Sequence, residues 1–205
     1  MSDCHVTVER EGVVTPDLIL RPWSPDDATG AFEIYGDRAT AEAIGRRHPV
    51  ADPEEMRTVI EGWAERSSKL PVPQGLWAVE ATNDGQLIGG ASLLPFSSAN
   101  PELVLGWHLR PGSRGRGAAG QIGHALAHQA FFSSAVDQVF VVAGTDNAAS
   151  IAVARRLGMS DVDSMPWSHQ GIRLHVLRMN RDALHRIRPG VSLDSSYNPE
   201  GLDDW

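Results

Sequence analysis

The stretch RGRGAAG, residues 114–120, contains the residue types of a phosphate-binding loop. Its glycines and alanines let backbone N–H groups come within hydrogen-bonding distance of a phosphate, and a helix that begins there adds a partial positive charge. Arg114 and Arg116 add two full positive charges. The same residues also fit an ordinary glycine-rich turn with two solvated arginines, so the assignment depends on the elements that flank the loop.

Gly115 to Gly120 also match G-x-G-x-x-G, the pattern of dinucleotide-binding folds. Those folds place the first glycine almost directly after a strand and contain two βαβαβ halves. Here residues 110–114 separate the preceding strand from Gly115, and the sequence shows one clear strand-helix-strand crossover. The only lysine, Lys69, is remote, so the lysine-containing loop of the P-loop nucleotide-binding proteins is absent too. Both nucleotide-binding interpretations are therefore disfavoured.

The segments on either side of the loop predict the elements that would position it. Residues 102–109, ELVLGWHL, predict a strand, and apolar residues along one face from about Gly117 to Phe132 predict a helix. The nearly unbroken apolar run 137–144 predicts a strand buried on both faces. A second helix is predicted from Asn147, with Gly158 at its C-terminal glycine position.

The rest of the chain predicts antiparallel strands and two capped helices. Ser24 and Asp52 each precede a proline and acidic residues, which is the signature of a helix start. Two apolar runs flank Asn83-Asp84-Gly85, a turn sequence typical of a hairpin. Residues 162–168 and 172–180 predict two further strands near the C-terminus.

Composition limits the domain count and the class of partner. A chain of 205 residues, 41% of them hydrophobic, can build one substantial core but not two full catalytic domains. We therefore expect a single domain over residues 1–188 and a flexible or partner-packed tail over 189–205. The formal net charge of -8 disfavours a general nucleic-acid binder or a protein of anionic membrane surfaces, because both need a basic footprint.

The sequence gives no sign of a membrane segment or a metal site. No apolar run reaches the roughly 18 residues of a membrane span, and the N-terminal MSDCHVTVEREG lacks the apolar core of a signal peptide. We therefore expect a cytoplasmic protein. The chain has one cysteine, and its acidic and histidine residues do not cluster at ligand spacing, so we expect no metal.

Two motifs at matching spacing resemble those of the GCN5-related N-acetyltransferase superfamily. Residues 114–119, RGRGAA, match the [QR]-x-x-G-x-[GA] loop, which in that superfamily follows the fourth strand, opens the third helix and binds the pyrophosphate of acetyl-coenzyme A. Residues 146–159, DNAASIAVARRLGM, resemble the next motif, N-x-x-[AS] running into L-G-[FM]. The opening LILRPWSPDDATGAFEIYGD and the later RLHVLRMNRDAL resemble the branch of ribosomal-protein N-terminal acetyltransferases, the RimJ/RimL type.

The resemblance, which spans about residues 17–187, implies an α/β fold. Its sheet would be mixed, mainly antiparallel and twisted, with about seven strands flanked by helices and a splay between the fourth and fifth strands. Acetyl-coenzyme A would lie in that cleft, with its pantetheine arm along the backbone near His108 to Arg110. The coenzyme-binding residues that the resemblance implies are Leu109, Arg110, Arg114, Gly115, Arg116, Gly117, Ala118, Ala119, Asn147 and Ser150.

The chemistry that the resemblance implies is direct attack of an amine on the thioester, which requires an uncharged amine, an oxyanion donor and a proton for the leaving thiolate. Many members supply that proton from a tyrosine at the position of Ala154, and the two tyrosines here, Tyr35 and Tyr197, do not lie nearby. In the RimL-like branch a serine can replace it, here Ser150. Ser150 fits a first-turn helix serine equally well, and Asn147 fits a helix N-cap.

Two histidines are candidates for the general base, because imidazole has a suitable pKa. His169 lies in the C-terminal hairpin, where the branch often places a carboxylate that this sequence lacks. His108 lies on the strand that would line the cleft, and alternation puts it on one face with Val104 and Gly106. Either histidine also fits a surface or packed residue.

The resemblance implies an N-acetyltransferase that moves an acetyl group from acetyl-coenzyme A to a primary amine, on a protein N-terminus or a small molecule. One alternative keeps the fold but uses a longer acyl donor such as succinyl-coenzyme A. Another is a catalytically degenerate acyl-coenzyme A sensor, since the usual tyrosine is missing. Relatives often pair, so a homodimer is an open alternative to a monomer.

Overall fold

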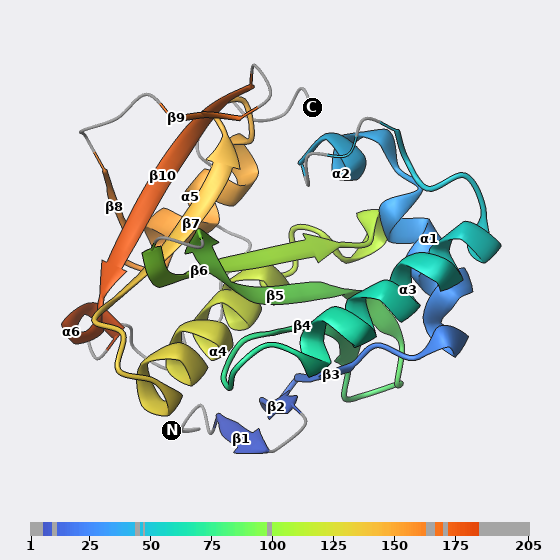
Figure 1. The fold of residues 1–205 in the computed structure, drawn as a ribbon, viewed down its shortest axis with the longest axis horizontal. Helices are drawn as coiled ribbons and strands as arrows, with labels where there is room; N and C mark the ends of the chain where they lie inside the picture. Colours follow the sequence, from blue (N-terminus) through green and yellow to red (C-terminus); the bar gives the residue numbers. More distant parts are fainter. Residues whose placement is uncertain are drawn as a thin grey trace.

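The computed structural model describes residues 6–9, 12–43, 46, 48–97, 100–162, 167–169 and 172–184, so the predicted boundary between residues 188 and 189 lies outside it. Figure 1 shows the elements in chain order. The strands are β1 (Thr7–Glu9), β2 (Gly12–Val14), β3 (Leu18–Pro22), β4 (Gly75–Ala81), β5 (Leu87–Ser97), β6 (Asn100–Leu109), β7 (Gln138–Gly144), β8 (Ser160–Asp161), β9 (Trp167–His169) and β10 (Ile172–Asn180). The helices are α1 (Ala28–Tyr35), α2 (Arg38–Ala43), α3 (Pro53–Ser68), α4 (Ala118–Ser133), α5 (Ala148–Arg156) and α6 (Arg181–Leu184), with short 3-10 helices η1 (Pro25–Asp27) and η2 (Pro111–Ser113).

The described strands form one sheet in the order β1-β2-β3-β4-β5-β6-β7-β10-β8, and β9 pairs with β10. Neighbours run antiparallel except β6 and β7, which are parallel and are connected by α4. The predicted α/β fold with a mixed, mainly antiparallel sheet is confirmed. The described residues contain 10 strands rather than about seven, because β1, β2 and β8 are too short for apolar alternation to reveal them.

The parallel strands β6 and β7 separate soon after they meet. They pair only at Leu103 with Val139 and at Val104 with Phe140, although β6 continues to Leu109 and β7 to Gly144. Figure 1 shows β7 and β10 running side by side in a direction clearly different from that of β5 and β6. The predicted splay is therefore present, and the edge of β6 beyond Val104 has no ladder to β7.

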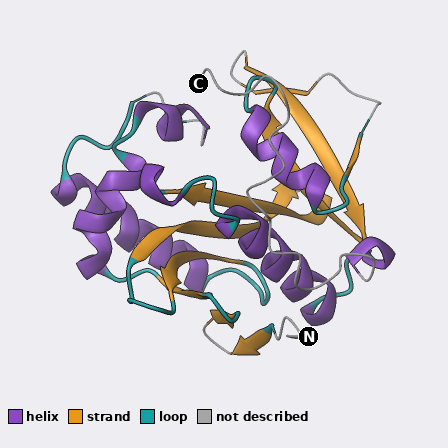
Figure 2. Cartoon of the chain, turned by 180° about the vertical axis from the view of Figure 1, so that it is seen from behind, coloured by secondary structure: helices purple, strands orange, loops and turns teal. Residues whose placement is uncertain are grey.

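Helices cover both faces of the sheet, as Figure 2 shows from behind. Alternate residues of β4 mark the two layers, because Trp77 and Val79 pack in a core cluster with α4 and α5, whereas Ala78 packs with α1 and α3. The predicted apolar face of α4 is fully buried in the first cluster. Its residues are Ile122, Ala125, Leu126 and Ala130.

The local signals read from the sequence operate as expected at helix starts and turns. The Asp52 side chain caps α3 by accepting a hydrogen bond from the backbone of Glu55 at 2.8 Å, with Pro53 in the first turn. Gly85 and Gly158 adopt φ of 68° and 78°, at the β4–β5 hairpin and just after α5. Among the described residues, no helix is both long enough and apolar enough to cross a membrane.

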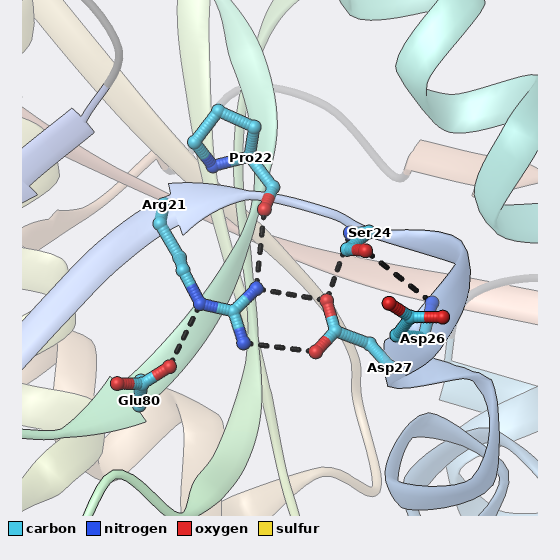
Figure 3. Close-up of polar contacts among 6 residues, drawn as sticks. All are labelled: Arg21, Pro22, Ser24, Asp26, Asp27 and Glu80. Atoms are coloured by element: carbon cyan, nitrogen blue, oxygen red, sulfur yellow. Dashed lines mark hydrogen bonds and ion pairs between the residues drawn. The ribbon is translucent and has the colours of Figure 1, made fainter.

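A guanidinium network joins β3, η1 and β4 (Figure 3). Arg21 donates from Nη1 and Nη2 to the two carboxylate oxygens of Asp27, both at 2.8 Å, and from Nε to Glu80 at 2.7 Å. Asp27 also accepts a hydrogen bond from the backbone N–H of Ser24 at 2.8 Å. Burial alone would raise the pKa of Asp27, but the hydrogen bonds from Arg21 and Ser24 outweigh burial and hold it below its usual value.

Candidate active site

The loop between β6 and α4 depends on two glycines in the left-handed region. Gly115 has φ of 74°, and Gly117, the N-cap of α4, has φ of 83°. Residues with a Cβ atom rarely adopt these angles, so the glycine spacing is required by the backbone path. The loop follows η2 and leads directly into the 16-residue helix α4.

The loop presents a set of unused backbone donors. Within the described part of the chain, no acceptor takes a hydrogen bond from the backbone N–H groups of residues 115–119. Ala118 and Ala119 belong to the first turn of α4, where N–H groups lack an intrahelical partner and the helix dipole is positive. This donor set fits an anionic group such as a phosphate or diphosphate.

The three arginines of the loop differ in their contacts. Arg110 forms an ion pair with Glu33 of α1. Arg114 donates from Nε to the carbonyl oxygen of Leu109 at 3.2 Å, and its Nη2 lies 3.3 Å from the Thr40 hydroxyl and 3.5 Å from Asp37. Arg116 is exposed, and no hydrogen bond or ion pair holds it to any described residue. Arg116 is therefore the guanidinium most available to a ligand.

The splay opens a small cavity between β6, β7 and the start of α5. The cavity brings together His108 of β6 with Asn147 and Ser150 at the start of α5, two segments that are far apart in the chain. The full lining is Leu105, Gly106, Trp107, His108, Val141, Val142, Ala143, Asn147 and Ser150. The cleft that the motifs implied is thus present at the point where the β6–β7 ladder ends.

Asn147 and Ser150 meet at the first turn of α5. The Asn147 side-chain oxygen accepts a hydrogen bond from the backbone N–H of Ser150 at 3.1 Å, so Asn147 is the N-cap of that helix. Both residues are partly buried and line the cavity. The Ser150 hydroxyl makes no hydrogen bond to the described residues, so the back-bond to its own helix is not formed.

His108 is on β6 and is partly buried between the cavity and an aromatic cluster. Its ring centroid lies 5.8 Å from that of Tyr35 on α1. Burial lowers the pKa of His108 to about 4. Desolvation therefore favours the neutral form of the ring near neutral pH in the free cleft, and the role of His108 as a base stays a prediction.

Tyr35 was not expected near the site, and the sequence contains no local signal for it. The residue is buried, and burial raises the pKa of its phenol, so the hydroxyl stays protonated. It reaches His108 because α1 packs against β5, the strand next to β6. Long-range packing of this kind cannot be read from motif spacing.

His169 occupies a different place from His108. Its backbone lies in β9 and pairs with Ile172 of β10, and Trp167 of the same strand pairs with Leu174, which in turn pairs with Gly144 at the end of β7. The side chain of His169 lies outside the part of the chain that the structure describes. Its role as a base stays a prediction.

The sequence profile of the acetyltransferase (GNAT) domain family matches residues 17–160 of this chain. The chain belongs to this GNAT acetyltransferase family. The match contains both elements of the cleft, from the loop at 114–119 to the start of α5, and it makes the protein an acyl-coenzyme A-dependent acetyltransferase.

Solved structures of GNAT proteins share the fold. A GNAT-family acetyltransferase from Bacillus anthracis is 15% identical, with a TM-score of 0.69 over 83% of this chain and 99% of that one. A protein from Vibrio cholerae assigned as a ribosomal-protein-serine acetyltransferase is 17% identical, with a TM-score of 0.69 over 85% and 99%. The microcin C7 self-immunity acetyltransferase MccE, solved with acetyl-CoA and AMP, is 14% identical, with a TM-score of 0.70 over 84% and 97%.

The GNAT family uses acetyl-coenzyme A, and the residues present fit that group. The unused N–H groups at 115–119 and the exposed Arg116 match a diphosphate in charge and hydrogen-bonding type. The open edge of β6 after Val104 offers backbone donors and acceptors to an extended arm. Among the described residues, no group of three or more His, Cys, Asp or Glu side chains is placed to hold a metal ion.

Proposed function

We propose that this GNAT acetyltransferase moves an acetyl group from acetyl-coenzyme A to a primary amine by direct attack within a ternary complex. The observation that carries the proposal is the meeting of the donor-rich loop, the open edge of β6 and the Ser150 hydroxyl around one cleft. Each supplies a different requirement of amine acetylation: coenzyme binding, placement of the thioester, and a proton donor.

The loop and β6 would bind and orient the donor. Residues 115–119 would donate backbone hydrogen bonds to the diphosphate, with Arg116 adding charge. The edge of β6 from Gly106 to Leu109 would pair with the pantetheine arm, and an N–H of that edge would stabilise negative charge on the acetyl oxygen. Asn147 would hold the start of α5 against the cleft while capping the helix.

Ser150 would protonate the leaving thiolate. As the amine nitrogen bonds to the acetyl carbon and the carbon–sulfur bond breaks, the sulfur takes the hydroxyl proton of Ser150. The serine then recovers a proton that the amine releases on forming the amide, through water in the cleft. Ala154, at the position of the usual tyrosine, is fully buried in the core, which leaves Ser150 as the hydroxyl on α5 that lines the cavity.

A neutral amine is required, because most alkyl amines are ammonium ions near neutral pH. His108 remains neutral there, so its imidazole would accept a hydrogen bond from the amine rather than store a proton. His169 is retained as the second candidate for the base. The location in the cytoplasm and a homodimer are likewise retained as predictions.

Either a protein N-terminus or a small-molecule amine is a suitable acceptor class. The Vibrio cholerae neighbour, assigned as a ribosomal-protein-serine acetyltransferase, supports the first, and MccE, a self-immunity acetyltransferase, supports testing small molecules. A longer acyl donor, such as succinyl-coenzyme A, is an alternative. The missing tyrosine at Ala154 favours a second candidate function, a coenzyme sensor without turnover.

The first experiment measures, by calorimetry, the affinity for acetyl-coenzyme A of the intact protein and of two variants that each replace one glycine of the loop. Gly117→Ala places a Cβ at φ of 83° and should weaken binding about tenfold, because the left-handed conformation costs roughly 1–2 kcal/mol for an L-residue. Gly112→Ala, in the same loop but with open space around it, is the matched control and should bind normally. Absence of binding to the folded intact protein would reject the proposed function.

A thiol-release assay then separates the alternatives. Acetyl- and succinyl-coenzyme A are each offered with N-terminal peptides, amino acids, polyamines and aminoglycosides. Turnover with acetyl-coenzyme A supports the proposal, and turnover with succinyl-coenzyme A alone supports the longer donor. Tight binding without turnover across the panel supports the sensor.

A further inference from the structure

The coenzyme loop is tied to the helical segment α1–α2 by two arginine–carboxylate contacts. Arg110, at the start of the loop, pairs with Glu33 of α1. Arg114, just before the first left-handed glycine, lies 3.5 Å from Asp37, which precedes α2. The two contacts hold the two ends of the segment that leads from β6 to Gly115.

Asp37 is the centre of the second contact. Its Oδ2 accepts hydrogen bonds from the backbone N–H and the hydroxyl of Thr40, both at 3.0 Å, and the same Thr40 hydroxyl lies 3.3 Å from Arg114. Thr40 is buried, so it cannot easily follow a displaced guanidinium. Burial would raise the pKa of Asp37, but the hydrogen bonds from Thr40 and the charge of Arg114 outweigh it, so the carboxylate is ionised near neutral pH.

Arg114 also makes a hydrogen bond within the loop, to the residue that precedes it at the end of β6. Its Nε donates to the carbonyl oxygen of Leu109, the last residue of β6. The guanidinium therefore joins three points: the end of β6, Thr40 of α2 and the carboxylate of Asp37. A side chain held in this way is directed toward α2, whereas Arg116 has no such restraint among the described residues.

We propose that Asp37 is a positioning residue for the coenzyme loop: through Arg114 it fixes the backbone donors at 115–119, and Arg116 is the arginine that contacts the diphosphate. The proposal rests on the proposed function for the identity of the ligand, but its geometry is a property of the free protein. It changes the role that the motif alone assigns to Arg114, from phosphate contact to fixing the loop.

The first test follows amide hydrogen–deuterium exchange of residues 110–121 in the ligand-free protein. Asp37→Asn keeps an oxygen that can accept from Thr40 but removes the charge that attracts Arg114. Glu42→Gln is the matched control, because Glu42 lies on the same helix, α2, but its ion pair is with Arg38 and not with an arginine of the loop. Exchange in the loop should rise about two- to fivefold in Asp37→Asn and stay unchanged in Glu42→Gln, as expected for a partly exposed ion pair. Equal exchange in both variants would overturn the proposal.

The second test compares acetyl-coenzyme A affinity by calorimetry. Asp37→Asn and Arg114→Gln should each weaken binding by about two- to fivefold, and the double variant should be no weaker than either single variant. Arg116→Gln should weaken binding by about tenfold, because it removes a charged hydrogen bond to the ligand. If Asp37→Asn instead tightens binding while Arg114→Gln weakens it, Arg114 contacts the phosphates itself and the proposal is wrong.

Kinetics with an accepted amine provide the last readout. Asp37→Asn should raise KM for acetyl-coenzyme A and leave kcat at saturating coenzyme unchanged, because the loop is restored once the ligand is bound. A fall in kcat alone would contradict the positioning role. Failure of the proposed function is distinguishable, since loss of acetyl-coenzyme A binding in the intact protein would leave the exchange result in the free protein intact.

Discussion

The Tyr35 hydroxyl lies directly over the α-carbon of Gly90, so a Cβ added at Gly90 would be 2.2 Å from the phenol oxygen. Gly90 pairs with His108 across β5 and β6, and therefore the same contact links the α1 side of the molecule to the cleft. Gly90→Ala should destabilise the protein by about 1–3 kcal/mol, the range for overpacking a filled core. Urea denaturation followed by tryptophan fluorescence measures the change.

Gly62→Ala on α3 is the control for that experiment, because no atom lies within 4 Å of its added Cβ. It should be neutral or stabilising by up to roughly 1 kcal/mol, as for Gly→Ala within a helix. Tyr35→Phe removes the atom that clashes and should recover part of the loss in the double variant. The remainder comes from Trp23, whose ring would lie 2.9 Å from the new Cβ. An unchanged midpoint for Gly90→Ala would contradict the packing described.

The sequence predicts the fold well where one segment carries its own signal. The caps at Ser24 and Asp52, the turn at Gly85 and the apolar face of α4 are local patterns, and the structure confirms them. The loop and the order of elements around it follow from motif spacing in the same way. Strands of two or three residues, such as β8, contain too few positions for a periodic pattern.

The parts of the site that the sequence does not predict come from contacts between distant segments. Arg114 meets Asp37, and Tyr35 meets His108, across large separations in the chain, so no local pattern encodes either contact. The pKa of His108 is another case, because desolvation depends on what packs over β6 and not on the residue type.

The lowered pKa of His108 predicts a loss of stability in mild acid. The unfolded imidazole titrates near 6.5 and the folded one near 4, so between these pH values the unfolded state binds more protons. The contribution of the neutral, buried His108 to the unfolding free energy is therefore fully present above about pH 6.5 and is lost as the pH falls toward 4. His108→Gln should make the decline in unfolding free energy over that range shallower by about 1–3 kcal/mol.

Urea unfolding at a series of pH values measures this slope. Some decline will remain in the variant, because burial also lowers the pKa of His124 and His128. His48→Gln, which makes the same substitution at an exposed histidine, is the control for the change of residue itself. Parallel curves for the intact protein and His108→Gln would show that His108 is not desolvated in solution.

The Arg21 network predicts that replacing a partly buried arginine lowers the unfolding free energy more than replacing an exposed one. Arg21→Gln leaves the carboxylate of Asp27, only 10% exposed, without its bidentate partner and should cost about 1–3 kcal/mol of unfolding free energy. Arg38→Gln removes an 85% exposed partner of Glu42 and should leave the unfolding free energy unchanged within experimental error. Thermal and urea unfolding of both variants measure the two changes in stability. Equal changes would show that the Arg21 network is solvated and contradict the prediction.

The acid stability of Arg21→Gln provides a second check. The pKa of Asp27 is lowered in the folded protein, so its contribution is present above the ordinary carboxyl value of 3.8 and is lost as the pH falls through the folded value. Arg21→Gln removes the largest cause of that lowering and leaves the hydrogen bond from the backbone N–H of Ser24. The part of the acid-induced decline in unfolding free energy that comes from Asp27 should therefore be smaller in the variant than in the intact protein.

Ser150 allows the chemical step to be separated from coenzyme binding. Ser150→Ala removes the hydroxyl that would protonate the thiolate but keeps the backbone N–H that Asn147 caps. We expect kcat to fall about 100-fold, within the range for loss of a general acid, with little change in the affinity for acetyl-coenzyme A. Steady-state thiol release and calorimetry on the same preparation measure the two quantities.

The control for Ser150→Ala is Ser68→Ala, at the exposed end of α3, where the hydroxyl bonds only to the carbonyl oxygen of Glu65. If Ser150→Ala turns over at the rate of the intact protein, another group protonates the thiolate. The next experiment would then replace Tyr35 by phenylalanine, because its hydroxyl stays protonated near neutral pH and its ring contacts His108 at the cleft. Loss of turnover in Tyr35→Phe with unchanged stability would identify Tyr35 on α1, and not Ser150 on α5, as the group that protonates the thiolate.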